Sequence, residues 1–493
     1  MPYPSHPTGI GSLPFELLCS ILEHLKPRRR AHVGVEFDDR SETDDGFNDS
    51  EEESSSGSQD GFNEADGVED VSDSFPMMAE TSSQFHVYFR KSDILCCGSV
   101  SKLWREAALP LLFEEVWVSY WSELQGQEDG MEFPDGSYGR KKSLEAFVAF
   151  LEAHPTIRCF IQVLTLVRRD MHNFEHEEVM PDPSHTTMAA LLARTFLPKL
   201  RVLRMDDVLL RASSDDPSCF ADNYAKPVLQ RLEMRYPYRS APLGISLNAH
   251  RVLDLLSIFG EIGHLELFVI QDSLEFPEEA EALCGHGNLE LSISSLSMVT
   301  VSSETLLDTL GRAGAFKLLS RIAFDMQMAR VHEVLLVHTG PKLEHLFVRL
   351  TSTDGWEESP SLELCTSLQT IAFQFTFYGD AAHIPNRLAW RDIESMLHSL
   401  IHTSPPLQLV TLSMYYMEWQ EAPHTNPGLF KDAHEEISAV HDTLCRLADN
   451  CPRLSVVIRH AGHHGEKMPA ESKPLFEDVF HRLHERGKLS VLI

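Results

Sequence analysis

The stretch Pro341-Lys342-Leu343-Glu344-His345-Leu346 decides how this chain folds, because it leads into a strand through a pattern that several other segments share. A proline is followed two residues later by a leucine and three residues after that by a second leucine, which begins the apolar pair Leu346/Val348. Proline marks a turn, and alternating apolar residues are typical of a strand with one buried face. The same pattern occurs at Pro198-Lys199-Leu200-Arg201-Val202-Leu203. We therefore expect short strands, each entered through a turn.

Eleven such apolar pairs can be identified after residue 143, and amphipathic helical stretches lie between many of them. The pairs are Leu164/Leu166, Leu203/Met205, Leu232/Met234, Leu265/Leu267, Leu296/Met298, Ile322/Phe324, Leu346/Val348, Ile371/Phe373, Leu412/Met414, Val456/Ile458 and Leu489/Val491. The helical stretches include Ser143–His154, Arg251–Ile262, Ser303–Ala313, Ala329–His338, Asp392–His402, Glu435–Ala448 and Leu475–Arg486. A strand with two or three inward apolar residues cannot fold alone, whereas a stack of such units buries a continuous core. We expect residues 143–493 to form one stacked α/β domain.

This pattern resembles the degenerate leucine-rich repeats (LRRs) that follow many fungal F-box modules. Repeats of this class run about 20–29 residues and often keep an asparagine after the strand. Here successive apolar pairs begin 24 to 44 residues apart, and that asparagine is mostly missing. The resemblance implies an irregular LRR-like α/β solenoid. The alternative is an open α/β domain with a conventional parallel sheet.

A short amphipathic helix is predicted near the N-terminus, over residues 12–27. Ser12 is a good N-cap, and proline at position 14 suits the first turn because it needs no hydrogen-bond donor there. Its apolar residues recur at helical spacing up to Pro27. A helix of this length is marginal in water unless its apolar face is buried against a partner.

A second amphipathic pattern covers residues 92–115. It contains Val100, Ser101 and Trp104, and Ser101 can cap the helix that carries the tryptophan. Pro110 is expected to break this helix.

Taken in order, Leu-Pro-x-Glu-Leu-Leu, an apolar helix and Val-Ser-x-x-Trp-Arg resemble an F-box split into the segments 12–27 and 92–115. The resemblance implies three small helices that bind a Skp-type adaptor, and through it a cullin–RING ubiquitin ligase. The residues that it assigns to adaptor binding are Leu13, Pro14, Leu17, Leu18, Ile21, Leu22, Leu25, Val100 and Trp104. Trp104 is expected to serve the module's own core more than the partner. The alternative is two unrelated core helices.

The segment 28–91 between the two halves departs from the family, whose members join them with a few residues. Closing a loop of about 64 residues costs roughly 2.4 kcal/mol more than closing one of about 4. Burying one leucine returns about 1.5–3 kcal/mol, so docking of the halves is still favoured. Residues 36–73 contain sixteen acidic residues and one basic residue. We expect an acidic disordered insertion, either simply solvated or a regulatory tract that kinases modify.

Composition and charge exclude several classes of function. The net charge of −32 argues against a nucleic-acid-binding surface. The nine cysteines show no repeated metal-binding spacing and suggest reduced thiols. Because neither a signal peptide nor a long apolar run is visible, no membrane association is expected. These features predict a cytoplasmic and/or nuclear protein.

One polar patch is predicted from the residues that alternate with the core-facing apolar residues on neighbouring strands and therefore point away from the core. Its members are Arg201, Arg204, Arg231, Glu233 and Arg235. Arginines gathered on an acidic chain could bind an acidic or phosphorylated substrate through bidentate contacts. The alternative is an ordinary solvated surface with ion pairs to Asp206 and Asp207.

No catalytic motif is visible: the sequence lacks a nucleophile elbow, a phosphate-binding loop and a zinc-protease helix. We expect a non-enzyme that needs no cofactor or metal. The predicted organisation is a disordered N-terminus (1–11), the split F-box, a linker (116–142) and the solenoid. The predicted function is substrate recognition in an SCF-type ubiquitin ligase, with an unidentified protein substrate. The alternative is an LRR-like interaction scaffold without a role in ubiquitin ligation.

Overall fold

The structure of the chain, a computed structural model, describes residues 102–120, 144–168, 183–206, 208, 226–235, 249–270, 289–301, 303–325, 329–350, 359–377, 383–416, 433–462 and 472–492. These residues form one sheet of twelve parallel strands, in which each strand pairs with those before and after it in sequence. The strands are β1 (Glu115–Tyr120), β2 (Val163–Arg168), β3 (Val202–Asp206), β4 (Val228–Arg235), β5 (Glu261–Ile270), β6 (Ser292–Val301), β7 (Arg321–Asp325), β8 (His345–Leu350), β9 (Thr370–Phe377), β10 (Leu409–Tyr416), β11 (Ser455–Gly462) and β12 (Leu489–Leu492). The predicted α/β class is confirmed.

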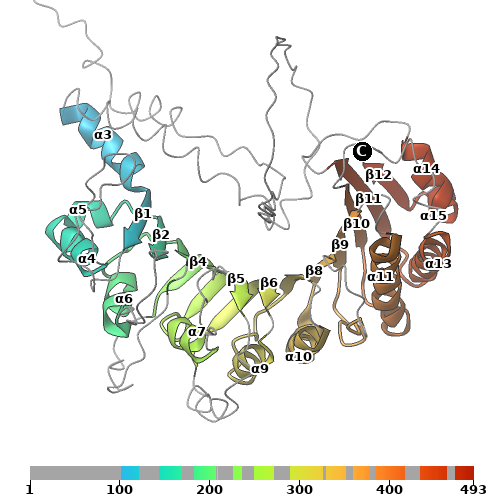
Figure 1. Cartoon of the computed structure of the whole chain (residues 1–493), viewed down its shortest axis with the longest axis horizontal. Helices are drawn as coiled ribbons and strands as arrows, with labels where there is room; N and C mark the ends of the chain where they lie inside the picture. The colour runs from blue at the N-terminus through green and yellow to red at the C-terminus, as the bar shows by residue number, and fades with distance from the viewer. Residues whose placement is uncertain are drawn as a thin grey trace, which may run out of the picture.

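The helices cover one face of this sheet. They are α3 (Lys102–Phe113), α4 (Leu144–Ala153), α5 (Pro155–Arg158), α6 (His185–Leu192), α7 (Ala249–Leu256), α9 (Glu304–Arg312), α10 (Ala329–Thr339), α11 (His383–Thr403), α13 (His434–Asn450), α14 (Ser472–Val479) and α15 (His481–Glu485), with a 3-10 turn η8 (Gly340–Lys342). Figure 1 shows a curved sheet whose strands line the inner side of an arc and whose helices lie on the outer side. We call the face of the sheet that points away from the helices the inner face.

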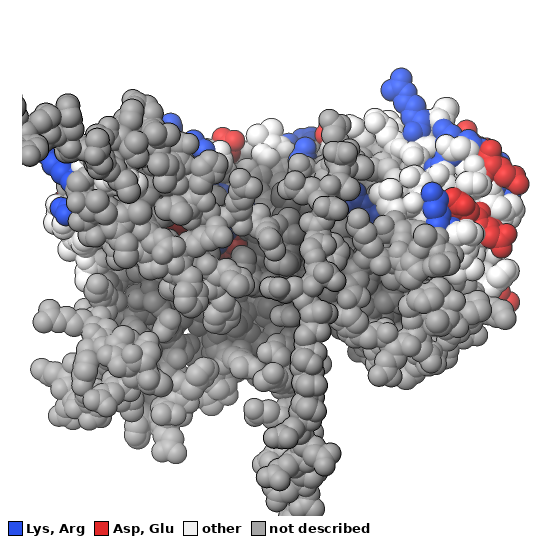
Figure 2. Space-filling model, turned by 90° about the horizontal axis from the view of Figure 1, so that it is seen from above, with Lys and Arg blue, Asp and Glu red and all other residues white. Residues whose placement is uncertain are grey.

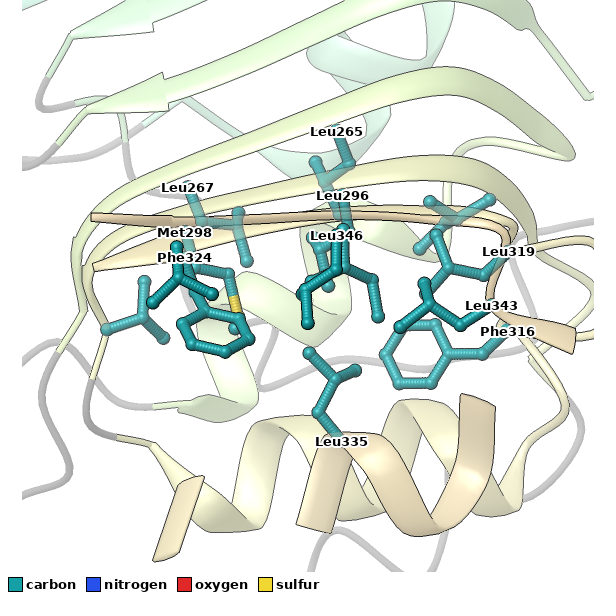
Figure 3. Packing of buried hydrophobic residues seen from close by; sticks show 14 of the residues in the cluster. Leu265, Leu267, Leu296, Met298, Phe316, Leu319, Phe324, Leu335, Leu343 and Leu346 are labelled. Carbon is teal, nitrogen blue, oxygen red and sulfur yellow. The ribbon is translucent and has the colours of Figure 1, made fainter. Parts of the chain in front are cut away.

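The core lies between the sheet and the helices, and strand alternation builds it. In β3, Leu203 and Met205 are fully buried, while the flanking residues remain partly exposed. Register carries this pattern from strand to strand, so that Leu296, Ile322 and Leu346 lie in one row. In Figure 3, Leu335 points from α10 toward this row. Because the register aligns these residues, the row forms one continuous core through the sheet. Burial of each such leucine stabilises the fold by about 1.5–3 kcal/mol.

The turns that enter the strands are also stacked. Leu319, Leu343 and Leu368, each three residues before an inward apolar residue, are buried. The amide of Glu344 donates to the carbonyl of Ser320 at 2.9 Å, and the amide of Gln369 donates to that of Glu344 at 2.8 Å. These bonds continue the ladder beyond the strands and satisfy backbone groups that the turns would otherwise bury.

All eleven predicted apolar pairs lie in strands, and the structure adds β1, which begins the segment expected to be a linker. Two helix predictions were wrong. Helix α7 ends at Leu256, and β5 replaces the end of the predicted helix from Glu261 onward. Pro110 lies inside α3 and does not break it, so the helix continues to Phe113.

The predicted N-terminal segments 1–11, 12–27 and 28–91, and residues 92–101 of the second F-box half, lie outside the described residues. Among the helices that the structure describes, none is both long and apolar enough to cross a membrane.

Candidate interaction surface

The inner face presents rows of side chains that run across the strands, because parallel strands in register bring equivalent positions together. The central row is Trp117, Thr165, Arg204, Glu233, Glu266, Ser297, Ala323, Phe347, Ala372, Thr411, Val457 and Ser490. The row is charged at β3–β5 and largely apolar at β7–β9. Two regions of different chemistry therefore share one face.

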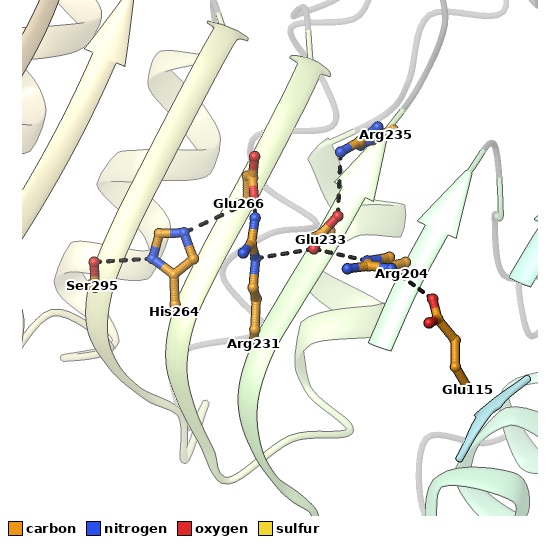
Figure 4. Close-up of polar contacts among 8 residues, drawn as sticks. All are labelled: Glu115, Arg204, Arg231, Glu233, Arg235, His264, Glu266 and Ser295. Atoms are coloured by element: carbon orange, nitrogen blue, oxygen red, sulfur yellow. Dashed lines mark hydrogen bonds and ion pairs between the residues drawn. The ribbon is translucent and has the colours of Figure 1, made fainter. Parts of the chain in front are cut away.

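Glu233 on β4 is the centre of the charged region and is only 1% exposed. Arg204 Nε lies 3.1 Å from its Oε1, and Arg231 Nε lies 3.0 Å from the same atom. Arg235 Nη2 lies 3.3 Å from Oε2. Figure 4 shows the three guanidinium groups converging on this carboxylate from β3 and β4. A buried carboxylate is thus compensated on both of its oxygens.

The contacts continue to both sides of Glu233. Arg204 also donates to Glu115 on β1 at 3.1 Å, and Arg231 donates to Glu266 on β5 at 2.6 Å. We call Glu115, Arg204, Arg231, Glu233, Arg235 and Glu266 the charge network. Its three arginines and three glutamates balance, so the network as a whole carries no net charge.

Burial governs titration around the network. Burial raises the pKa of Glu266, and the nearby Arg231 opposes that rise. Burial and then the positive charge of Arg231 lower the pKa of His264 to about 4, so this histidine is neutral at physiological pH. Its Nδ1 lies 3.0 Å from Ser295 Oγ on β6. A continuous chain of polar contacts therefore extends from β1 to β6.

Four members of this network, Arg204, Arg231, Glu233 and Arg235, belong to the polar patch predicted from the sequence, and its role in binding a substrate remains a prediction. Within the described residues, these arginines contact Glu115, Glu233 and Glu266. Asp207, one of the two acidic partners considered, lies outside the described residues. The other residue, Asp206, has a pKa raised by burial and lowered in part by Arg235.

Arg201, the fifth predicted residue, does not belong to the network. It lies in the turn before β3 with its side chain exposed. Its backbone amide donates to Gln162 at 2.8 Å, and its carbonyl accepts from Gln230. The residue therefore lies on the edge where strands begin, away from the rows of the inner face.

A second polar group on the inner face, at β7–β11, was not predicted. Arg349 Nε lies 3.6 Å from Asp325 Oδ1, and burial raises the pKa of Asp325 to about 6 in spite of that arginine. In the same row across the strands follow Gln374, Ser413 and Arg459. Strand alternation could have revealed three of these residues, because Arg349, Gln374 and Ser413 each lie between two buried apolar residues of their strand.

Helix α3 holds the one predicted adaptor-binding residue that the structure describes. Trp104 is 5% exposed and is buried in α3 with Ala107 and Ala108, and its role in the core of an F-box module remains a prediction. Lys102 and Glu106 lie on the exposed side, 3.8 Å apart. The other predicted adaptor-binding residues, Leu13, Pro14, Leu17, Leu18, Ile21, Leu22, Leu25 and Val100, lie outside the described residues.

The described surface at the C-terminal end has mixed charge. Figure 2 shows basic and acidic side chains interspersed there. Arg482 pairs with Asp442, and Arg486 pairs with Asp449 at 2.8 Å. Exposed pairs of this kind contribute little to stability. In the described part of the chain, no group of three or more His, Cys, Asp or Glu residues is arranged to hold a metal ion.

No known protein-family model and no curated protein sequence matches this chain.

Proposed function

We propose that this chain is the substrate-recognition subunit of an SCF-type cullin–RING ubiquitin ligase. The observation that carries the proposal is the ordered pair Leu13-Pro14-Phe15-Glu16-Leu17-Leu18 and Val100-Ser101-Lys102-Leu103-Trp104-Arg105, which resembles the two ends of an F-box. The helical state of the second half from Lys102 onward, with Trp104 buried, supports this interpretation.

The rest of the described chain supports an LRR-like solenoid as the substrate-binding part. Its strands are parallel, pair in sequence order and carry helices on one face, whereas a conventional doubly wound sheet carries helices on both. Such an arc leaves one long sheet face for a protein partner. α3 leads into β1, so the adaptor-binding and substrate-binding parts would be joined without a flexible linker at that point.

In this role the chain acts by proximity and not by chemistry of its own. One end binds the Skp-type adaptor, and the inner face holds a substrate, so that a lysine of the substrate is kept close to activated ubiquitin. Holding two reactants together raises their effective concentration, which accelerates transfer without a catalytic side chain in this subunit.

The test is co-purification with the adaptor. Leu17→Glu and Ile21→Glu should each abolish co-purification, because a charge in an apolar interface is costly to desolvate. Val337→Glu is the matched control, since Val337 is 64% exposed on the outer side of α10 and should change nothing. Retention of the adaptor by both N-terminal variants would refute the ligase role.

An interaction scaffold without a role in ubiquitin ligation is the second candidate. The inner face favours it, since a long sheet face can bind a protein with or without an adaptor. A wild-type chain that binds protein partners but never captures a Skp-type adaptor would point to the scaffold.

A further inference from the structure

The C-terminal half of the inner face differs from the charge network in its electrostatic balance. One row across β8, β9, β10 and β11 consists of Arg349, Gln374, Ser413 and Arg459. Tyr415 lies two residues after Ser413 on β10. We call these five residues the basic strip. Arg349 has Asp325 as an acidic neighbour at 3.6 Å. The guanidinium of Arg459 has no ion-pair partner among the described residues, and its buried Nε has no hydrogen-bond partner there.

Tyr415 lies between the two arginines. Its hydroxyl is close enough to both guanidinium groups that each lowers its pKa, although burial raises that pKa more. Ser413, two residues earlier on the same strand, is in register with Gln374 and Arg459. The strip therefore combines two cations with neutral hydrogen-bonding side chains.

An apolar floor lies beside the strip. Ala323, Phe347 and Ala372 are in register on β7, β8 and β9, and form a small cluster separate from the main core. Phe347 is 8% exposed. These three side chains are buried, so they keep water away from the sheet beside the strip, which strengthens ionic contacts there.

The spacing of the arginines limits what can bind to both. Arg349 and Arg459 are three strand positions apart, which corresponds to roughly 14 Å at about 4.8 Å per strand. An extended peptide advances about 3.3 Å per residue. Two acidic side chains about four residues apart would therefore reach both guanidinium groups.

The local charge favours carboxylates over phosphates. A carboxylate matches the fork of one arginine in a bidentate contact and carries a single negative charge. A phosphate brings more negative charge, close to 2, near Asp325, which is itself acidic. Repulsion from Asp325 makes the dianion the poorer match at the Arg349 end.

We propose that the basic strip binds an extended acidic segment of a partner protein, with two Asp or Glu residues about four positions apart, lying across strands β8–β11. The charge network cannot offer such a site, because glutamates of this chain already occupy its arginines. This inference deepens the proposed role in substrate recognition and rests on it for the biological meaning of the partner. The binding itself requires no adaptor.

The test is fluorescence anisotropy with the full-length chain and a labelled peptide that has two Glu residues four positions apart and apolar residues between them. Binding should weaken as salt is raised. Arg459→Gln should lower affinity by about tenfold or more, as expected for loss of a charge-assisted contact. Arg453→Gln is the matched control: it removes the same charge from an exposed turn residue just before β11, and should change affinity by less than about twofold.

Three results would overturn the proposal: no binding of the Glu peptide, equal binding of a Lys-for-Glu peptide, or equal loss with Arg453→Gln. Tighter binding of a phosphoserine-for-Glu peptide would replace carboxylate with phosphate as the ligand and would also refute it. Adaptor co-purification by Arg459→Gln separates the two proposals. A variant that keeps the adaptor but loses the peptide supports the strip. A wild-type chain that binds the peptide but fails to co-purify with a Skp-type adaptor contradicts only the ligase role.

Discussion

Replacement of Glu233 by glutamine tests whether the charge network stabilises the sheet. The substitution keeps the shape of the side chain and removes one negative charge from a site that is 1% exposed. Removing one partner of a buried ion pair typically costs about 3–5 kcal/mol, because a charge is left uncompensated. Here Arg204 keeps Glu115 and Arg231 keeps Glu266, whereas Arg235 loses its contact with Glu233. We therefore expect Glu233→Gln to lower the free energy of unfolding by about 3 kcal/mol, near the lower end of that range.

Glu290→Gln is the matched control. It makes the same chemical change at a side chain that is 85% exposed and lies 3.7 Å from Lys226. An exposed pair of this kind contributes about 0–1 kcal/mol, so the control should unfold close to the wild type.

Urea unfolding followed by circular dichroism, combined with amide hydrogen exchange, measures both variants. Stacked repeats contact only their neighbours, so the loss should first appear as faster exchange in β3, β4 and β5. If Glu233→Gln and Glu290→Gln unfold at the same urea concentration and exchange alike, the arginines do not depend on Glu233, and the reasoning from burial fails.

Two other substitutions test the titration of a buried carboxylate on the inner face and the packing of a turn before β8. In the folded protein the pKa of Asp325 is raised from its ordinary value of 3.8 to about 6. The contribution of this group to the free energy of unfolding is therefore fully present at pH values below 3.8 and is lost as the pH rises through 6. Asp325→Asn should therefore gain stability relative to the wild type as pH rises from about 4 to about 7, in urea unfolding at several pH values. If the difference in the free energy of unfolding between the two proteins does not change with pH, the pKa of Asp325 is not raised in the folded state. Gly340→Ala should cost about 1–3 kcal/mol, since a Cβ at this position would lie 2.8 Å from Leu364 Cβ and 3.0 Å from its carbonyl oxygen. Thermal unfolding of this variant at the wild-type temperature would mean that the turn before β8 shifts freely.

The strands could be predicted from the sequence because their signal is local. An apolar pair such as Leu346/Val348 indicates a strand with one buried face from only three residues. All eleven predicted pairs lie in strands. β1 was missed because Val116 and Val118 lie just after a helix, in a segment that reads as a linker. The predicted helix over Arg251–Ile262 failed for a non-local reason: from Glu261 onward the backbone pairs with β4 and β6, and this pairing outweighs local helix periodicity.

The environment of the arginines could not be predicted, because it depends on register between distant segments. Arg204 meets Glu233 across 29 residues of sequence and Glu115 across 89. Charge counting alone gives three arginines in a short stretch and suggests an open basic patch. Only the strand order shows that acidic side chains from β1, β4 and β5 reach the same row.

The contact between Arg204 and Glu115 also changes how the N-terminal end of the sheet should unfold. In a simple stack, coupling runs only between neighbouring strands, so a terminal strand can detach alone. Arg204 reaches past β2 to β1, and Glu233 joins the same arginine to β4. Detaching β1 therefore requires breaking an ion pair to β3 as well as the ladder to β2. Because α3 leads into β1, the network holds the entry to the sheet at a fixed position relative to β3–β5. If the proposed ligase role holds, this rigidity would keep the inner face of β3–β5 at a defined distance from α3.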